Sequence, residues 1–207
     1  MAVEGIRDVA GVDIDHAATL GFRIKLVALA SEDGGRLFQR VHPCLVPLAH
    51  PLAHVAGALN AVVAEGDFAG RLFFSGAGAG AGPTASAIVA DLIDVARGEV
   101  GPAFAMPTSR LAALDRADTA DHVGRFYLRL TVTDRPGVLA ELTAALRDAG
   151  VSIESLIQRG TAAVDAGVYV VMVTHAVREA AVTAALARMA ASDAVTARPV
   201  MMHLLDF

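Results

Sequence analysis

The clearest hydropathy pattern lies in the second half of the chain, from residue 126 onward. Apolar and polar residues alternate over 126–133, which is the two-residue period of a half-buried strand. Apolar residues then recur at helical spacing over 138–149, and Gly150 marks the end of that helix. The remaining predicted elements are strands at 151–158 and 168–174, a helix carrying Val182, Ala185, Leu186 and Met189, and a final strand at 196–204.

This order of elements, βαββαβ, is that of a ferredoxin-like α+β fold. In that topology the first and third strands are central and the fourth strand is an edge. The third strand is nearly all apolar, and the fourth contains Pro199, which lacks a backbone donor and suits an edge. We therefore expect a ferredoxin-like domain over residues 124–207.

The first half has shorter apolar runs, which predict an α/β arrangement of a mixed sheet with helices. The predicted helices span 13–20 and 54–64, and the predicted strands span 24–30, 40–46 and 71–74. A further helix follows Pro83 and ends at Gly98, with one apolar face made by Ile88, Leu92, Val95 and Ala96. The segment after it is rich in proline and glycine and then polar, so we predict a linker at 106–123 that separates domains at 1–105 and 124–207.

A glycine-rich segment, SGAGAGAGPTASA at residues 75–87, joins the strand at 71–74 to this amphipathic helix. Glycine permits positive φ and lets backbone N–H groups approach a ligand, and a helix N-terminus adds partial positive charge. The segment therefore suits a phosphate, a carboxylate or a nicotinamide amide, and Pro83 suits a first helical position. The alternative is that its small residues let the helix pack tightly on the strand, and the segment alone does not separate the two interpretations.

The same segment partly matches the dinucleotide fingerprint, from Gly76 to Ala81, but the match does not predict a complete Rossmann domain. Such a domain needs a second parallel strand after the helix, ending in an acidic residue. Here the helix is followed by GEVGPAFAMP, which is unsuited to a buried strand. Glu99 therefore stands at the right distance in the wrong context.

We expect structural roles for the histidines, the cysteine and the lysine of the first half. His42, His50 and His54 lack suitably spaced carboxylates and a second thiol, so we predict no metal site. Cys44, the single cysteine, is expected to be a buried small residue, because a catalytic pair with His42 would need side chains two apart on a strand to converge. Lys25, the single lysine, is either a tuned general acid or the solvated end of a strand, and we favour the second.

Composition and charge narrow the class of protein. A chain of 207 residues has room for one large domain or two small ones. The net charge of −5, without basic clusters, argues against a nucleic-acid partner, and no apolar run reaches the length of a membrane span. The start of the chain lacks a secretory signal and one cysteine allows no intrachain disulfide, so a cytoplasmic setting is expected.

A second glycine-containing turn, DRPGVLAEL at residues 134–142, joins the strand at 126–133 to the helix that follows it. The free N–H groups at the start of that helix and the Asp134 carboxylate suit the zwitterionic head of an amino acid. The alternative is an ordinary turn in which Asp134 is a capping acceptor.

Together these motifs resemble homoserine dehydrogenase of the monofunctional bacterial type, in the C-terminal half of that protein. The segments that follow the order and spacing of its catalytic domain are VEGIRDVAGVDIDHAATLGFRIKLVALA, RVHPCLVPLAHPLAHVAGALNAV and SGAGAGAGPTASAIVADLIDVA. The later segment, FYLRLTVTDRPGVLAELTAALRDAGVSIESL, is similar to an ACT domain, a small regulatory module that binds amino acids. Cys44 stands where members of the family usually have threonine.

The resemblance implies an NAD(P)-dependent interconversion of aspartate semialdehyde and homoserine, on the route to threonine and methionine. It places Gly76, Gly78, Gly80 and Thr84 at the nicotinamide end of the cofactor. It also implies an ACT domain that forms homodimers or higher oligomers and binds an amino-acid effector, with threonine as the expected one. The expected effector-binding residues are Asp134, Arg135, Gly137, Val138, Ser152 and Ile153.

The resemblance further implies that the Rossmann domain, the acidic substrate-binding segment, the catalytic lysine and the sodium-binding loop precede the first residue. Lys25 lies in a different motif and does not inherit the catalytic role. Hydride transfer needs cofactor and substrate held together, so we expect no catalytic residue here and no dehydrogenase activity from this chain alone. The alternative function is a stand-alone ACT-type regulatory protein that binds amino acids.

Overall fold

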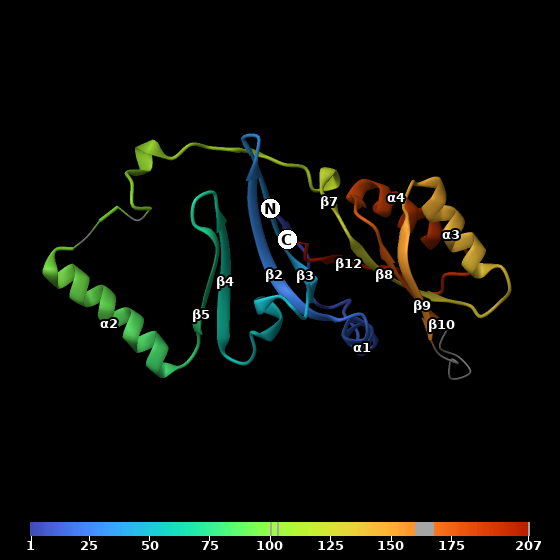
Figure 1. Cartoon of the computed structure of the whole chain (residues 1–207), viewed down its shortest axis with the longest axis horizontal. Coiled ribbons are helices and arrows are strands. Elements are labelled where there is room, and N and C mark those ends of the chain that lie inside the picture. Colours follow the sequence, from blue (N-terminus) through green and yellow to red (C-terminus); the bar gives the residue numbers. More distant parts are fainter. Residues whose placement is uncertain (100, 103, 160–167, 207) are drawn as a thin grey trace. The chain divides into compact units, whose positions relative to one another are not determined.

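The computed structural model describes residues 1–99, 101–102, 104–159 and 168–206 (Figure 1). The chain divides into two compact units, one made of residues 1–48 and 115–207 and one made of residues 49–114. The larger unit therefore draws on both ends of the chain. The predicted boundaries at 1–105, 106–123 and 124–207 remain predictions, and residues 100, 103, 160–167 and 207 within them lie outside the described part.

The second half of the larger unit has the predicted βαββαβ order, with a short extra strand, β11 (Val177–Arg178), before its second helix. Its strands lie in the order β12, β8, β10, β9, and neighbours in this group are antiparallel, so β8 and β10 are central. The arrangement is the ferredoxin-like fold that the sequence predicted. Its elements are β8 (Phe126–Val132), α3 (Val138–Asp148), β9 (Ile153–Arg159), β10 (Val168–Thr174), α4 (Glu179–Ala190) and β12 (Val200–Leu204).

The fourth strand of this fold is not a sheet edge, and that prediction is wrong. β12 pairs with β8 on one side and, in parallel, with β3 (Arg36–Pro47) on the other, where His203 lies opposite Cys44. Pro199 precedes the first residue of β12, so its missing N–H removes no ladder bond. Three further strands pair with β3 and complete an eight-stranded sheet: β1 (Ala2–Val3), β2 (Phe22–Asp33) and β6 (Asp115–Arg116).

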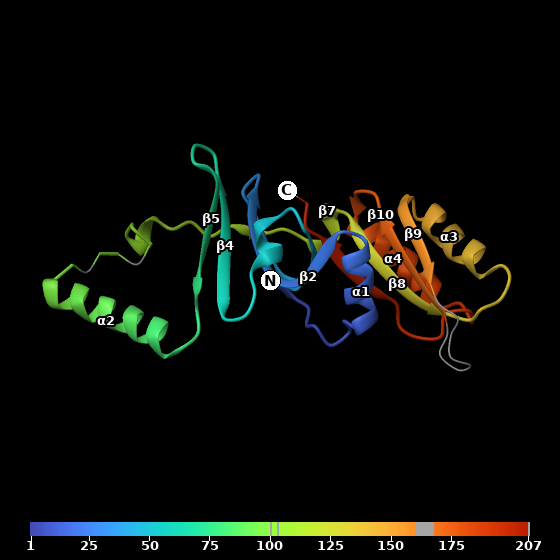
Figure 2. The ribbon, with the colours of Figure 1, turned by 60° about the horizontal axis from the view of Figure 1, so that its bottom comes forward.

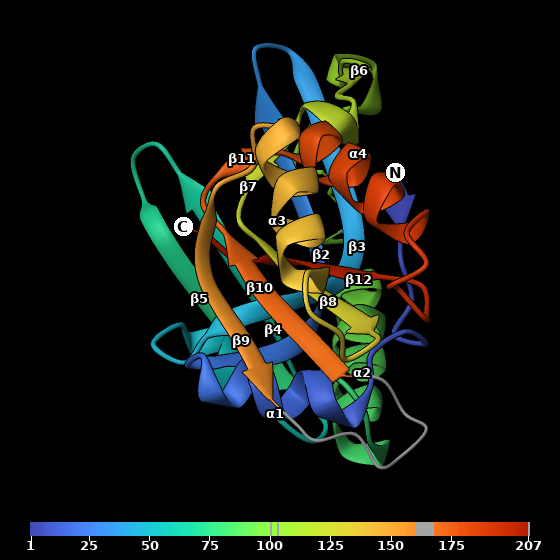
Figure 3. The same ribbon diagram turned by 90° about the vertical axis from the view of Figure 1, so that its right-hand side faces the viewer.

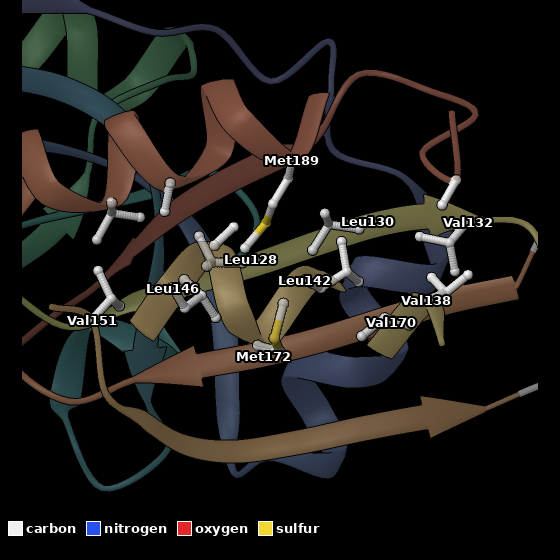
Figure 4. Close-up of a cluster of buried hydrophobic side chains, with 14 of the residues drawn as sticks. Leu128, Leu130, Val132, Val138, Leu142, Leu146, Val151, Val170, Met172 and Met189 are labelled. Carbon is white, nitrogen blue, oxygen red and sulfur yellow. The ribbon is translucent and has the colours of Figure 1, made fainter. Parts of the chain in front are cut away.

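Both faces of this sheet are covered where β8 runs. On one face α3 and α4 lie side by side (Figure 3) and pack on Leu128 and Leu130 of β8 (Figure 4). On the other face Tyr127 packs in a second cluster with Ala17 of α1 (Gly11–Thr19). The prediction that β8 is half-buried is therefore wrong, because Tyr127 is fully buried and Arg129 is only 9% exposed. A 3-10 helix, η3 (Thr119–Asp121), precedes the small strand β7 (Val123–Gly124) in the sequence. β7 pairs with β11.

The smaller unit contains a hairpin of β4 (Leu59–Gly66) and β5 (Gly70–Ala77), followed by α2 (Ala81–Arg97) (Figure 2). The predicted helix at 54–64 is wrong. A 3-10 helix, η1 (Pro51–His54), ends there, Gly57 adopts a positive φ of +62°, and β4 then pairs along its whole length with β5. A second 3-10 helix, η2 (Thr108–Arg110), lies near the end of this unit.

The amphipathic helix α2 forms as predicted and ends at Gly98, which has the left-handed conformation of a C-terminal cap. Its apolar face is uncovered, since Ile88, Leu92 and Val95 are each more than half exposed. None of its residues is buried. The alternative explanation of the glycine turn was that α2 packs tightly on the preceding strand. That packing is not observed.

Candidate functional site

The four predicted cofactor-binding residues lie in one continuous segment of the smaller unit. Gly76 is in β5, Gly78 follows that strand, and Gly80 caps the N-terminus of α2. The Thr84 N–H donates to the carbonyl of Gly80 at 3.1 Å in the first turn of the helix. All four residues are exposed. Pro83 is the third helical residue and not the first, which is still within the turn whose N–H groups have no helical acceptor.

The glycines of this turn are needed for different reasons. A Cβ on Gly76 would meet nothing within 4 Å, so that position faces open space. A Cβ on Gly78 would lie 1.7 Å from Nδ2 of Asn60, so the room left by this glycine is filled by the protein's own side chain. Gly80 has a φ of +120°, a conformation that residues with a Cβ rarely adopt.

The donors at this turn fit an anionic or amide group of a cofactor. No side chain caps α2, so the N–H groups of Ala81 and Gly82 have no partner from a capping residue and carry the positive end of the helix dipole. A phosphate, a carboxylate or the nicotinamide carboxamide would satisfy them. The described residues supply one side of such a site.

The predicted effector residues fall at two places in the ferredoxin-like fold. Asp134, Arg135 and Gly137 form the exposed turn before α3, where Gly137 has a φ of +94° and is the N-cap. Arg135 donates to Glu141 and forms an ion pair with it, 3.0 Å between Nη2 and Oε1. The Val138 side chain packs in the core, so an effector there would meet only its backbone.

Ser152 and Ile153 lie at the other end of α3. Ser152 precedes β9, and its carbonyl accepts from the His175 N–H at 2.9 Å. The eleven residues of α3 separate the two groups by roughly 16 Å. The structure therefore does not bring all six effector residues together within one chain.

Sequence reasoning missed a buried polar cluster around Asp13 of α1. Its Oδ1 accepts from the Tyr127 hydroxyl at 2.7 Å and from Nε of Arg129 at 2.6 Å, and its Oδ2 accepts from the Ala10 N–H at 2.8 Å. Burial and the bond to Asp13 raise the pKa of Tyr127. The alternation of β8 placed Tyr127 and Arg129 on one face, but nothing in the sequence indicated that the face is covered by α1.

A second missed cluster joins β3 to α4 and β12. Arg40 donates to both carboxylate oxygens of Glu179, at 2.7 and 2.6 Å, and also contacts His203, whose Nε2 lies 3.1 Å from Glu179. Burial alone would raise the pKa of Glu179, but hydrogen bonds from His203 and Arg40 lower it to about 2. The His203 ring packs edge-on against His42, and it tilts against His122.

The same neighbourhood explains the single cysteine and one of the histidines. Burial raises the pKa of Cys44 to about 12, so its thiol is a buried apolar group, as predicted. Burial and the nearby His203 and Arg40 lower the pKa of His42 to about 3. Lys25 does not lie at a strand end, because β2 begins at Phe22, and it is only partly exposed, opposite Cys44.

Within the described residues, no three histidine, cysteine, aspartate or glutamate side chains are arranged to hold a metal ion. His50 instead caps η1 and accepts from the Leu52 N–H at 3.2 Å. Among the helices in the described part of the chain, none has the length and apolar character needed to span a membrane.

Comparison with known proteins assigns the two parts of the chain to two families. Residues 1–93 match the homoserine dehydrogenase family, and residues 126–191 match the ACT domain. The homoserine dehydrogenase of Synechocystis is 41% identical over the whole chain, which is 49% of that relative. That of Neisseria gonorrhoeae is 37% identical over 99% of the chain and 48% of the relative.

A solved homoserine dehydrogenase from Thiobacillus denitrificans has the same fold, with a TM-score of 0.85 and 38% identity over 99% of the chain and 48% of that structure. The chain spans about half the length of the curated relatives it matches. The two family matches and the relatives that align with the chain from end to end indicate the same family. The chain belongs to the homoserine dehydrogenase family, of which it represents the C-terminal part, including the ACT domain.

Proposed function

We propose that this chain forms one wall of the active site of an NAD(P)-dependent homoserine dehydrogenase, completed by polypeptide that carries the nucleotide-binding fold and the catalytic lysine. The observation that carries the proposal is the glycine turn of Gly76 to Thr84. It presents exposed donors at an uncapped helix N-terminus but has no second wall among the described residues. The uncovered apolar face of α2 supports the same proposal, because a complementary part would bury it.

Bound NAD(P) would supply the hydride acceptor or donor for homoserine and aspartate semialdehyde. The role of this chain is to bind and orient. Gly76 leaves room for a planar group, Gly80 sets the path of the chain into α2, and the first N–H groups of that helix bind the group's acceptor atoms. The chain by itself supplies no group proposed to move a proton, so alone it is expected to be inactive.

The ACT part is proposed to bind an amino acid, with threonine as the first candidate, between two copies of the chain. The turn before α3 offers backbone donors, while Ser152 and Ile153 lie at the far end of that helix. A second copy that pairs its β9 with this β9 would bring the two groups together. Among the described strands β9 pairs only with β10, so its other edge is open to such pairing.

Reconstitution tests the proposed enzyme. The 207-residue chain is co-expressed with the half of the Synechocystis homoserine dehydrogenase that lies outside the aligned region. We expect oxidation of NADPH by aspartate semialdehyde with the complex and none with either half. Gly80→Val should reduce that activity, because valine does not tolerate the φ of +120°. An inactive complex that is correctly assembled would overturn the proposal.

A second candidate, a stand-alone amino-acid-binding regulator, is favoured by one observation. The larger unit has complete cores on both faces of its sheet, while α2 of the smaller unit buries no residue. Thermal unfolding with threonine tests effector binding, since a ligand that binds only the folded chain raises the melting temperature. Stabilisation by threonine together with an inactive reconstituted complex would favour this second function.

A further inference from the structure

Asn60 of β4 lies directly against the proposed cofactor-binding turn, although it is about sixteen residues earlier in the sequence. It is opposite Gly76 in the hairpin register, and its Nδ2 fills the position that a Cβ of Gly78 would take. The neighbouring backbone holds the turn in place, because the Gly78 N–H donates to the Ala58 carbonyl at 3.1 Å. Nothing in the hydropathy pattern marks this residue as part of a site.

The chemistry of Asn60 differs from that of everything around it. The turn from Gly76 to Gly82 consists of glycine and alanine, so its own hydrogen-bonding groups belong to the backbone. The Asn60 carboxamide is exposed, and no hydrogen bond joins it to another of the described residues. It therefore offers a donor and an acceptor side by side, next to the open space at Gly76.

We infer that Asn60 recognises the carboxamide of the nicotinamide ring, an inference that rests on the proposed function. A primary carboxamide presents one donor and one acceptor in the same plane, which is the complement of another primary carboxamide. Such a pair selects the amide and rejects a group that keeps only the acceptor, because a polar atom of Asn60 would then lose its partner. Asn60 is thus a specificity-determining residue for the cofactor.

Gly78 makes room for the side chain of Asn60. It leaves the space in which the Asn60 carboxamide sits, at 1.7 Å from where a Cβ would be. Alanine at this position would force the side chain of Asn60 to rotate, and the backbone of the turn would stay where it is. Gly78→Ala should therefore reproduce the loss of Asn60, and in an Asn60→Ala background it should add nothing.

The test is equilibrium binding, measured by the fluorescence of reduced nicotinamide in the reconstituted complex. Two ligands are compared: NADPH, and its analogue in which an acetyl group replaces the carboxamide. We expect Asn60→Ala to weaken NADPH binding about tenfold and to leave the analogue nearly unchanged. The control is Val62→Ala, two residues along the same face of β4 and also exposed, which should change neither ligand.

Each outcome bears on a different claim. A preference for NADPH over the analogue that disappears in Asn60→Ala and in Gly78→Ala, and persists in Val62→Ala, supports the inference. An unchanged preference in Asn60→Ala overturns it and leaves the proposed function standing. A correctly assembled wild-type complex that binds no NADPH overturns both. Amide NMR spectra of the 207-residue chain verify that each variant keeps its fold.

Discussion

Asp13 is a buried carboxylate whose three acceptor bonds all serve the larger unit. Asp13→Ala removes the carboxylate that pairs with the buried Arg129 guanidinium and accepts from the Tyr127 hydroxyl. An uncompensated charge in such a place costs about 3–5 kcal/mol, so we expect a loss of that size in the free energy of unfolding. Urea unfolding followed by circular dichroism measures it.

Tyr127→Phe is the matched control, because it removes one hydrogen bond and leaves the ion pair between Asp13 and Arg129 intact. The expected loss is about 1 kcal/mol. Equal losses for the two variants would show that Arg129 finds another partner or water, and would contradict the role given to Asp13.

The buried His42 predicts that stability falls on acidification. Its pKa is about 3 in the folded chain, against 6.5 for an unperturbed histidine. Between these two pH values the unfolded chain binds more protons, so the free energy of unfolding falls as the pH is lowered, by about 1.4 kcal/mol per pH unit for one such histidine. His122, whose pKa is lowered by burial and by His203, acts in the same direction.

Urea unfolding at pH 7.5 and 5.5 checks this, with His42→Leu as the comparison. The variant should lose less stability than the wild type between the two pH values. Glu179 adds its own dependence only lower, as the pH falls from about 4.5 to about 2. A wild type that is equally stable at pH 7.5 and 5.5 would contradict the prediction.

At the residue scale, the sequence indicated which residues matter better than it indicated what each residue does. It singled out Gly78, but as a place for a ligand to approach, whereas the structure fills that space with Asn60. It identified Cys44 as buried, because a single cysteine in an apolar strand usually packs in the core. It missed the pair of Asp13 and Arg129, since partners 116 residues apart leave no periodic signal in either segment.

At the scale of elements, the hydropathy pattern predicted elements well where it is regular and poorly where it is not. The helices α2, α3 and α4 follow their 3.6-residue patterns, and β10 its apolar run. β4 was mistaken for a helix because alanine and valine recur there without strict alternation, and only its pairing with β5 selects the strand. The pairing of β12 with β3 was not predictable from the sequence of either strand, because the tertiary fold decides which distant strands pair.

The open edge of β9 carries a prediction at the same scale. Leu156 is exposed there, so Leu156→Lys would place like charges together if two copies pair along this edge. We expect the variant to be monomeric where the wild type is dimeric, as measured by light scattering after size-exclusion chromatography. Ile6→Lys changes a more exposed apolar residue outside the strand, and this control should leave the dimer intact. A dimeric Leu156→Lys chain would show that the copies associate elsewhere.

At the scale of the whole molecule, the compact units do not follow the order of the sequence. Composition favoured a break after residue 105, but residues 1–48 share one sheet with residues 115–207. Among the described residues, two ion pairs join these two segments: Asp13 with Arg129, and Arg40 with Glu179. The ACT part is therefore joined to β3 by the pairing of β12, at His203 opposite Cys44 and Leu204 opposite Leu45.

This organisation predicts the result of nicking the chain within residues 49–114. Trypsin can cut after Arg97 or Arg110, which are both exposed. The two pieces should remain associated and elute together in native buffer, because β3 pairs with β12 and the buried Arg40–Glu179 and Asp13–Arg129 pairs join them without a covalent link. They should separate in urea. In Asp13→Ala, where an ion pair is lost, the pieces should part at a lower urea concentration than in the wild type. Pieces that separate in native buffer would instead indicate two independent domains divided near the predicted linker.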